Sequence, residues 1–370
     1  MDTCAPKGLT QVDDRTVLDE AYARLHRTGP EFSGYLSNHG PMAAEALIRH
    51  GHGGTVHRWL DGYVRRLEPF PATVAPIGAD WHGAMGNWRR VADWTRYFEA
   101  ELAEAPWPAV LNRWWPRLLP GIAAGATHGV IRVGHAVRSL LADGDGPAPL
   151  RVDELAQGLA YWAARWQPTA PVAGGWPAPS SRSGAADLAQ VLNALPRLTS
   201  ADGQSFDKWV GRMADVPGWS DAARRATVPQ DPVAAREWLA RLVDLAVIRY
   251  GRYGHGSPIM LVHSATAPQA VWRILPALDR ELWRDSAIAA WVAVASLTAI
   301  YAPAAAAAED GAPRPAPTAD DAFAEAAAHG DEHVIKFADT ALASWARTKD
   351  PGALAAIRRA RTLIPPAAAP

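Results

Sequence analysis

The 370-residue sequence is poor in cysteine and has almost no net charge. Cys4 is its sole cysteine, which excludes both a disulfide framework and a cysteine-based zinc site. The formal net charge is −1, with acidic and basic residues mixed along the chain. A surface that binds nucleic acid or an anionic membrane needs a concentrated positive patch, so neither partner is predicted.

Long apolar segments are also missing. No apolar run reaches the roughly 18 residues that suggest a membrane-spanning helix. The longest apolar stretch, 286–301, is typical of a buried helix. The first residues, MDTCAPKGLTQVDD, lack the charged-then-apolar pattern of a secretory signal. These features predict a cytoplasmic protein.

Strand-like alternation and phosphate-binding loops are absent as well. The glycine-containing segments GHGG, GAMGN and GRYGHGS do not follow a β-branched strand, so neither a Rossmann site nor a P-loop is predicted. No G-x-S-x-G nucleophile motif occurs. The sequence therefore disfavours the usual flavin- and nicotinamide-dependent folds.

What remains is a helical pattern along nearly the whole chain. Alanine is abundant, and apolar residues recur every three or four positions in segments such as NWRRVADWTRYFEAELAEA and VIRVGHAVRSLLADG. Pro41 fits the first turn of one helix, with Gly51 beyond its end. Gly144 follows a second helix, and Asp153 is a candidate N-cap of a third. The pattern predicts an all-α fold, a single large helical domain with a buried histidine-lined cavity.

The helical domain is predicted to cover residues 16–363. Residues 1–15 and the tail 364–370 are predicted to be frayed. The Ala/Pro-rich stretch 302–321, APAAAAAEDGAPRPAPTADD, has little to bury and is predicted to be a loop inside the domain. The chain has 17 tryptophans, for which core packing is a better explanation than a surface that binds an aromatic ligand.

Two stretches carry histidines at helical spacing. In GATHGVIRVGHAVRSLL, His128, Arg132 and His135 lie at i, i+4 and i+7 and share one helix face. An isolated pair of this kind is more often two core histidines than two ligands. Helical bundles, however, build metal sites from inward-facing side chains on adjacent helices, and a second stripe favours that interpretation.

The second stripe lies in HGDEHVIKFADTAL, where His329, His333 and Lys336 have the same spacing. Lys336 is one of only four lysines among 37 basic residues, and its neighbours are apolar. A surface lysine is the ordinary interpretation. A buried amine with a lowered pKa could instead form a Schiff base, or react with CO₂ to give a carbamate that binds a metal.

Two further histidines stand near predicted helix ends. His39, in SNHGPMAAEAL, precedes a helix N-terminus, and His263, in IMLVHSATAPQAVWRIL, lies where an apolar run meets a helix start near Pro268. Taken singly, each is more readily explained as a capping or core histidine.

Five stretches together resemble the questin oxidase-like family and follow the order of its motifs over residues 32–342. They are SNHGPMAAEAL, GATHGVIRVGHAVRSL, LAQGLAYWAARW, LVHSATAPQAVW and GDEHVIKFADTAL. The resemblance implies an all-helical oxygenase of specialised metabolism that acts with O₂ on polyketide anthraquinones or related polycyclic aromatics. It implies Baeyer–Villiger-type oxygen insertion or oxidative ring opening, in some members with NADPH as reductant.

The resemblance also implies a non-haem Fe(II) centre with four histidines and a carboxylated lysine. The positions that match the family's recurring residues are His128, His135, His263, His333 and Lys336. His39 lies in the family's Asn-His motif and is a further candidate, as a ligand or a catalytic group. Which four of the five histidines bind iron stays open. Arg132, one turn from His128, is expected to stabilise a phenolate or peroxide.

Three other functions stay open. The same oxygenation can proceed without metal, with the histidines acting as bases on a hydroquinone substrate. The chain can be a non-catalytic helical binding protein for an aromatic polyketide. It can also be an enzyme that forms a Schiff base on Lys336.

Overall fold

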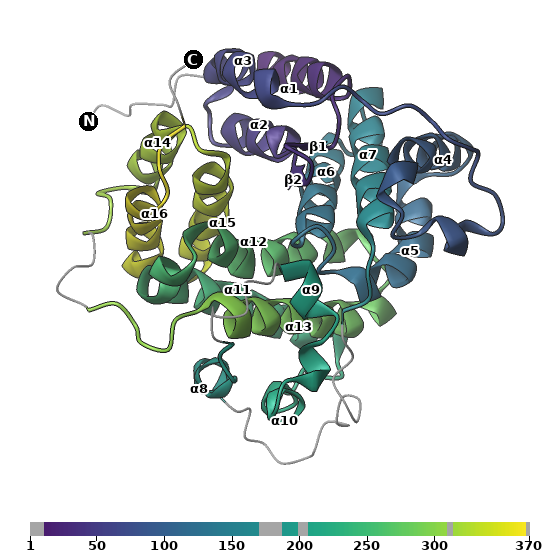
Figure 1. Ribbon diagram of the computed structural model, residues 1–370. Helices are drawn as coiled ribbons and strands as arrows, with labels where there is room; N and C mark the ends of the chain where they lie inside the picture. The colour runs from purple at the N-terminus through teal and green to yellow at the C-terminus, as the bar shows by residue number, and fades with distance from the viewer. Residues whose placement is uncertain (1–10, 170–186, 199–205, 309–313, 368–370) are drawn as a thin grey trace, which may run out of the picture.

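The structure confirms the all-α prediction. The computed structural model describes residues 11–169, 187–198, 206–308 and 314–367. Within these ranges it contains sixteen α-helices, short 3-10 turns and one two-stranded antiparallel hairpin (Figure 1). No helix in these ranges is long and apolar enough to cross a membrane.

The α-helices are numbered in chain order. Their bounds are α1 (Gln11–Leu25), α2 (Gly40–Arg49), α3 (Gly53–Tyr63), α4 (Val91–Glu104), α5 (Trp107–Leu118), α6 (His128–Asp143), α7 (Pro149–Arg165), α8 (Leu188–Ala194), α9 (Phe206–Val210), α10 (Trp219–Ala223), α11 (Pro232–Tyr253), α12 (Pro258–Ile274), α13 (Trp283–Tyr301), α14 (Ala319–His329), α15 (Glu332–Thr348) and α16 (Pro351–Leu363). The hairpin consists of β1 (Glu31–Phe32) and β2 (Leu36–Ser37) and leads directly into α2.

Four helices, α2, α6, α12 and α15, form a ring in which each packs against two others of the set. The helices α6 and α12 run in the same direction, because His128 lies beside His263 at one level and Gly134 lies against Ala270 about two turns further on. A Cβ on Gly134 would lie 2.6 Å from the Cβ of Ala270, so these two helices approach as closely as a glycine allows.

The remaining helices cover this ring (Figure 1). On one side α7 packs on α6 and α4 packs on α7, while on the other α14 and α16 pack on α15. The helices α11 and α13 flank α12, and α1 and α3 cover α2.

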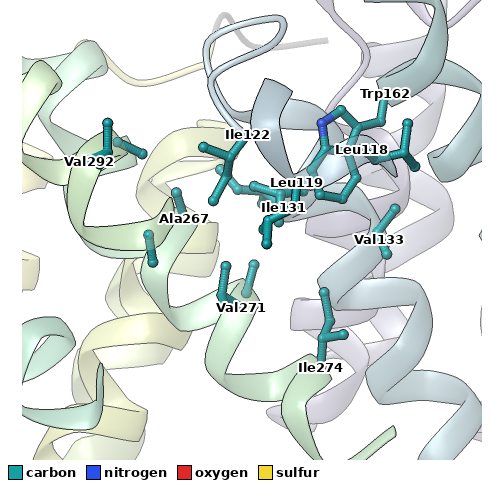
Figure 2. Close-up of a cluster of buried hydrophobic side chains, with 14 of the residues drawn as sticks. Leu118, Leu119, Ile122, Ile131, Val133, Trp162, Ala267, Val271, Ile274 and Val292 are labelled. Carbon is teal, nitrogen blue, oxygen red and sulfur yellow. The ribbon is translucent and has the colours of Figure 1, made fainter. Parts of the chain in front are cut away.

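The largest apolar core lies between α6, α7, α12 and α13 (Figure 2). Ile131 and Val133 of α6 meet Trp162 of α7 and Val271 of α12 there. Among the tryptophans in the described ranges, six are fully buried, as core packing predicts: Trp94, Trp114, Trp115, Trp162, Trp219 and Trp291.

Several predicted helix ends are confirmed. Pro41 lies in the first turn of α2, and the two glycines Gly51 and Gly144 follow α2 and α6 with φ of +78° and +69°. The predicted N-cap role of Asp153 is wrong, because α7 begins at Pro149, where a proline in the first turn starts the helix earlier.

The helix start predicted near Pro268 is also wrong. The helix α12 begins at Pro258, and Pro268 lies inside it. An interior proline costs roughly 3 kcal/mol or more. The helix tolerates it because nearly every residue from Leu261 to Ile274 is buried against its neighbours.

The predicted chain ends and loop fall partly outside the described residues. Residues 1–10, 309–313 and 368–370 are not described, whereas 11–15 already belong to α1. Within the predicted loop 302–321, residues 303–308 and 314–318 form neither helix nor strand, and α14 begins at Ala319.

Replacing Gly134 with alanine is expected to lower the free energy of unfolding by about 1–3 kcal/mol, because the added methyl group would overlap Ala270. Gly251 of α11 is the matched control, since a Cβ there would meet nothing within 4 Å. Gly251→Ala is expected to stabilise by about 0.5–1 kcal/mol through helix propensity. Urea denaturation of both variants checks this, and equal stabilities would contradict the close packing of α6 on α12.

Candidate metal centre

Four buried histidines meet inside the ring of helices. His39, His128, His263 and His333 each offer one ring nitrogen to a group in which these atoms all lie within 4.8 Å of one another. Each histidine comes from a different helix of the ring: His39 is the N-cap of α2, His128 begins α6, His263 lies in the second turn of α12, and His333 lies in the first turn of α15.

The nitrogens are close enough to share one ion. The Nε2 atom of His128 lies 2.6 Å from Nε2 of His39 and 3.0 Å from Nε2 of His263. The ring centroids of His39 and His333 are 4.5 Å apart. Two nitrogens bound to one tetrahedral ion at about 2.1 Å would be about 3.4 Å apart, so the group needs little adjustment to close on a metal.

Backbone carbonyls set the tautomers of two rings. The Nδ1 atom of His128 donates to the carbonyl of Gly125 at 2.6 Å, and Nδ1 of His263 donates to the carbonyl of Met260 at 3.3 Å. Because a carbonyl only accepts, Nδ1 carries the proton and Nε2 carries a bare lone pair in each neutral ring. The two Nε2 atoms lie 3.0 Å apart, so in these tautomers their lone pairs repel each other unless a proton or a metal ion lies between them.

Carboxylates stand beside the other two rings. Oε1 of Glu332 is 3.7 Å from Nδ1 of His39, and Oδ1 of Asp331 is 3.4 Å from Nδ1 of His333. A carboxylate beside Nδ1 favours the tautomer that carries its proton there, which leaves the other nitrogen free to bind a metal. Two of the four histidines, His128 and His263, thus have a hydrogen-bonded oxygen at Nδ1, whereas His39 and His333 have a carboxylate near Nδ1 that forms no hydrogen bond among the described residues.

The local backbone explains how the chain presents these rings. Gly125, Ala126 and Thr127 have φ of 53°, 54° and 70° and form a left-handed turn. This turn brings the carbonyl of Gly125 to the Nδ1 atom of His128. For Ala126 and Thr127 this conformation costs roughly 1–2 kcal/mol per residue, and such strain gathers at functional sites. Asp331 caps α15 by accepting from the backbone N–H of His333.

Three helices, α2, α6 and α15, begin at the histidine group, so the positive ends of their dipoles point at it. Burial lowers the pKa values of His39, His128 and His263 well below their ordinary value. The charge of Lys336 lowers each of these pKa values further. At neutral pH these imidazoles are uncharged, which is the form that binds metals.

Lys336 is fully buried beside these rings, and its Nζ atom has no hydrogen-bond partner among the residues that the structure describes. Burial lowers the pKa of Lys336 from 10.5 to about 7, although Glu332 and Asp331 oppose the shift. A substantial fraction of the amine is therefore neutral, and hence nucleophilic, near pH 7. The ordinary interpretation of Lys336 as a surface lysine is wrong.

His135 is not brought to this group. Its Nδ1 atom lies 2.8 Å from Oε2 of Glu45, next to Arg138. His135 follows His128 by seven residues, which is about 10 Å along the helix axis. The two histidines therefore share a helix face but lie at different heights along α6.

Two other sequence candidates also lie elsewhere. Arg132 donates Nε and Nη2 to the carboxylate of Glu154 at 2.6 and 2.8 Å, which engages its guanidinium in a buried ion pair. The ring of His329 pairs with the carbonyl of Ile364 at 3.1 Å. His39, by contrast, is one of the four histidines that meet.

Sequence reasoning missed the outer partners of the site. Asp331 was recognisable, because an aspartate just before a helical stretch is a common N-cap. Glu332 was not, since its contact with His39 and its 2.7 Å ion pair with Arg66 join distant parts of the chain. Nor was Tyr63, whose hydroxyl accepts from the backbone N–H of His39 at 2.6 Å.

The donor set fits a divalent transition metal. Neutral imidazoles suit iron, zinc, copper and nickel, and the buried lysine adds an oxygen ligand once carboxylated. A second group, Asp331, Glu332 and His333, also has ligand atoms within 4.8 Å of one another. The carboxylate of Asp331 already caps α15 and that of Glu332 pairs with Arg66, so these two acids serve better as outer partners.

The sequence model of the questin oxidase-like family matches residues 61–341, more than half of the chain. The chain belongs to the questin oxidase-like family. This confirms the resemblance seen in the motifs and supports, in broad terms, an oxygenase of secondary metabolism. The matched region contains His128, His263, His333 and Lys336, and it begins after His39. No curated protein matches the chain.

In the metal-free protein, stability is expected to rise with pH above 7 because of Lys336. Its folded pKa of about 7 lies below the ordinary 10.5, so the cost of burying the charged amine is full below pH 7 and disappears towards pH 10.5. The expected slope is up to about 1.4 kcal/mol per pH unit.

Comparison with Lys336→Met isolates this contribution, because the methionine variant lacks the titrating group. Urea denaturation of both metal-free proteins at pH 7, 8 and 9 in CO₂-free buffer measures it. The free energy of unfolding of the wild type should approach that of the variant as the pH rises. Parallel curves would show that Lys336 does not titrate in this range.

Proposed function

We propose that this chain is a non-haem iron oxygenase that uses O₂ to insert oxygen into, or to cleave, a ring of an anthraquinone-like polycyclic aromatic of polyketide metabolism. The observation that carries the proposal is the meeting of four buried histidine nitrogens within 4.8 Å of one another, two of which face each other at 3.0 Å. Membership of the questin oxidase-like family supports an oxygenase of secondary metabolism, and the substrate class is proposed from the resemblance of the motifs.

His39, His128, His263 and His333 would hold the iron. Bound Fe(II) would supply the one-electron chemistry that triplet O₂ needs to react with a closed-shell organic molecule. The chain's own contribution is to keep His39, His128 and His263 neutral by burial, to orient His128 and His263 through their Nδ1 protons, and to exclude bulk water.

Lys336 would complete the site as a carbamate. The neutral amine attacks the carbon of CO₂, one N–H proton leaves to solvent, and the product is an anionic oxygen ligand. The structure favours this product in two ways: the Nζ atom is unpartnered, and the N-terminal ends of α2, α6 and α15 stabilise negative charge there.

Apolar side chains border the histidine group and suit a flat aromatic substrate. Met260, whose carbonyl accepts from His263, and Ala126, which follows Gly125, pack against a cluster that includes Phe206 of α9. The ring of Tyr301 lies 6.2 Å from that of Phe206 in the same cluster.

The hydroquinone form of the substrate can supply electrons to O₂. NADPH is the alternative reductant, although the sequence holds no dinucleotide motif for it. A cavity of about 630 Å³ between α1, α4 and α7 is lined by His26, Asp153 and Gln157 among others, and none of the four histidines lines it. The proposal therefore places the reaction at the histidine group rather than in that cavity.

The purified protein is expected to bind one Fe(II) per chain and to consume O₂ with a hydroxylated anthraquinone or anthrahydroquinone. Alanine at His39, His128, His263 or His333 should weaken metal binding and O₂ uptake by at least about 100-fold, since loss of even an outer partner typically costs 10–100-fold. His329→Ala is the matched control and should keep both. Metal analysis and an oxygen electrode provide the measurements.

Two results would contradict this proposal. Full O₂ uptake after chelation, with no bound metal, would favour metal-free oxygenation of a hydroquinone. Tight binding of the aromatic without O₂ uptake, tolerant of alanine at the four histidines, would favour a binding protein.

A carbamate on Lys336 is expected to appear as a ¹³C resonance of the protein in ¹³C-bicarbonate, absent from Lys336→Ala and kept in the exposed-lysine control Lys208→Ala. Lys336→Ala should lose activity and regain part of it with a short carboxylic acid, which replaces the missing anionic oxygen. Borohydride trapping of substrate on Lys336 would instead support a Schiff base and contradict the carbamate.

A further inference from the structure

A second group of buried polar side chains joins the same four helices that carry the histidines. It lies deeper in the ring, on the C-terminal side of each histidine. Its members are Glu45 of α2, His135 and Arg138 of α6, Arg273 of α12 and Asp339 of α15, all buried or nearly so. We call this group the ion cluster.

The contacts of the ion cluster run between helices. Arg138 donates Nε to Glu45 at 2.8 Å and Nη1 to Asp339 at 2.9 Å, which ties α6 to α2 and to α15. Arg273 donates Nη2 to Asp339 at 2.6 Å, which ties α12 to α15. His135 donates Nδ1 to Glu45 at 2.8 Å, a second link between α6 and α2.

The ion cluster is electrically balanced. It holds two carboxylates and two guanidinium groups, and burial lowers the pKa of His135 to about 4, so that ring is neutral. Burial alone would raise the pKa of Glu45, but Arg138 and His135 outweigh it and lower this pKa to about 2. Every charge has a partner, and removing one partner leaves another charge buried without compensation.

Each helix carries its histidine and its ion-cluster residue at a fixed separation. Six residues separate His39 from Glu45 and His333 from Asp339, and ten separate His263 from Arg273. At about 1.5 Å of rise per residue, the ion cluster lies about 9–15 Å along the helices from the histidine group. An axial slip of one helix would therefore disturb both groups together.

Apolar packing alone specifies this register weakly. The helices α2 and α15 contribute several alanines to one apolar cluster, among them Ala43, Ala46, Ala338 and Ala341, and Gly134 of α6 faces Ala270 of α12. Small side chains form shallow ridges, so neighbouring registers differ little in packing. Directional buried polar contacts are the best-attested way to select one register.

We infer that the ion cluster, with Asp339 at its hub, positions the four histidines by fixing the axial register of α2, α6, α12 and α15 before metal binds. Asp339 is the hub because it accepts from Arg138, Arg273 and His50. The inference rests on the proposed metal centre. The members of the ion cluster are positioning residues that need not touch the metal or the substrate.

The test compares Asp339→Asn with Asp244→Asn in the full-length metal-free protein titrated with Co(II). Asp244 of α11 pairs with Arg347 of α15 at 2.5 Å, so its loss also breaks an ion pair to α15 but leaves the ion cluster whole. Asp339→Asn should bind Co(II) about 10–100-fold more weakly, with shifted visible absorption bands. Asp244→Asn should match the wild type in both.

A second pair of variants keeps the test decisive if Asp339→Asn does not fold. Arg273→Met removes one arm of the ion cluster while Arg138 still pairs with Asp339, and Arg273→Lys keeps the charge. Weaker Co(II) binding by Arg273→Met, restored in Arg273→Lys, would support positioning. A folded Asp339→Asn or Arg273→Met with wild-type affinity and absorption bands would overturn the inference, because a purely structural role changes the folded fraction and not the metal's spectrum.

The outcomes separate this inference from the proposed function. If the wild type binds Co(II) and Fe(II) but consumes no O₂ with the aromatic, the oxygenase proposal fails. The positioning role of the ion cluster is then still tested by the Co(II) affinity and the visible absorption bands of the variants. If the wild type binds neither metal, the metal centre is wrong and the inference falls with it.

Discussion

The Nε2 atoms of His128 and His263 face each other 3.0 Å apart, and the surrounding structure holds the two rings in this repulsive arrangement. Carbonyl oxygens hold the Nδ1 protons of both rings on the far side, a strained left-handed turn supplies one of those carbonyls, and burial removes the water that could separate the rings. A cation bound between the rings would convert the repulsion into attraction, and this is the physical basis of the proposed metal centre.

The arrangement of the helices gives this site its electrostatic character. Because α2, α6 and α15 start at the histidines, their dipoles oppose protonation of the imidazoles and favour an anion. Burial lowers the pKa of Lys336 to about 7, so its amine is partly neutral at neutral pH. Neutral imidazoles and a lysine able to become an anionic ligand would suit the Fe(II) that we propose for this site. The carboxylates of Asp331 and Glu332 stay outside, beside the rings they orient.

Much of the fold and part of the site could be predicted from the order of residues alone. The three-and-four spacing of apolar residues predicted an all-α chain, and histidine spacing together with a rare lysine drew attention to His128, His333 and Lys336. The helix start near Pro268 and the N-cap at Asp153 were wrong, because an earlier proline in each case starts the helix. His135 shares a helix face with His128, but that face extends along the whole helix. Only the packing of α6 against its neighbours decides which residues of the face lie next to the other histidines.

The sequence by itself determined the local features of this protein: its helices, several of their ends, and the residue types able to bind a metal. Local spacing suffices for these because they depend on interactions within a few residues. Only the tertiary structure decided that His39 joins the group, that His135 pairs with Glu45, and that Glu332 stands beside His39. Those outcomes depend on the mutual register of four helices that are distant in sequence. No single segment encodes this register, because contacts between helices, such as those of Arg138 with Glu45 and Asp339, select it.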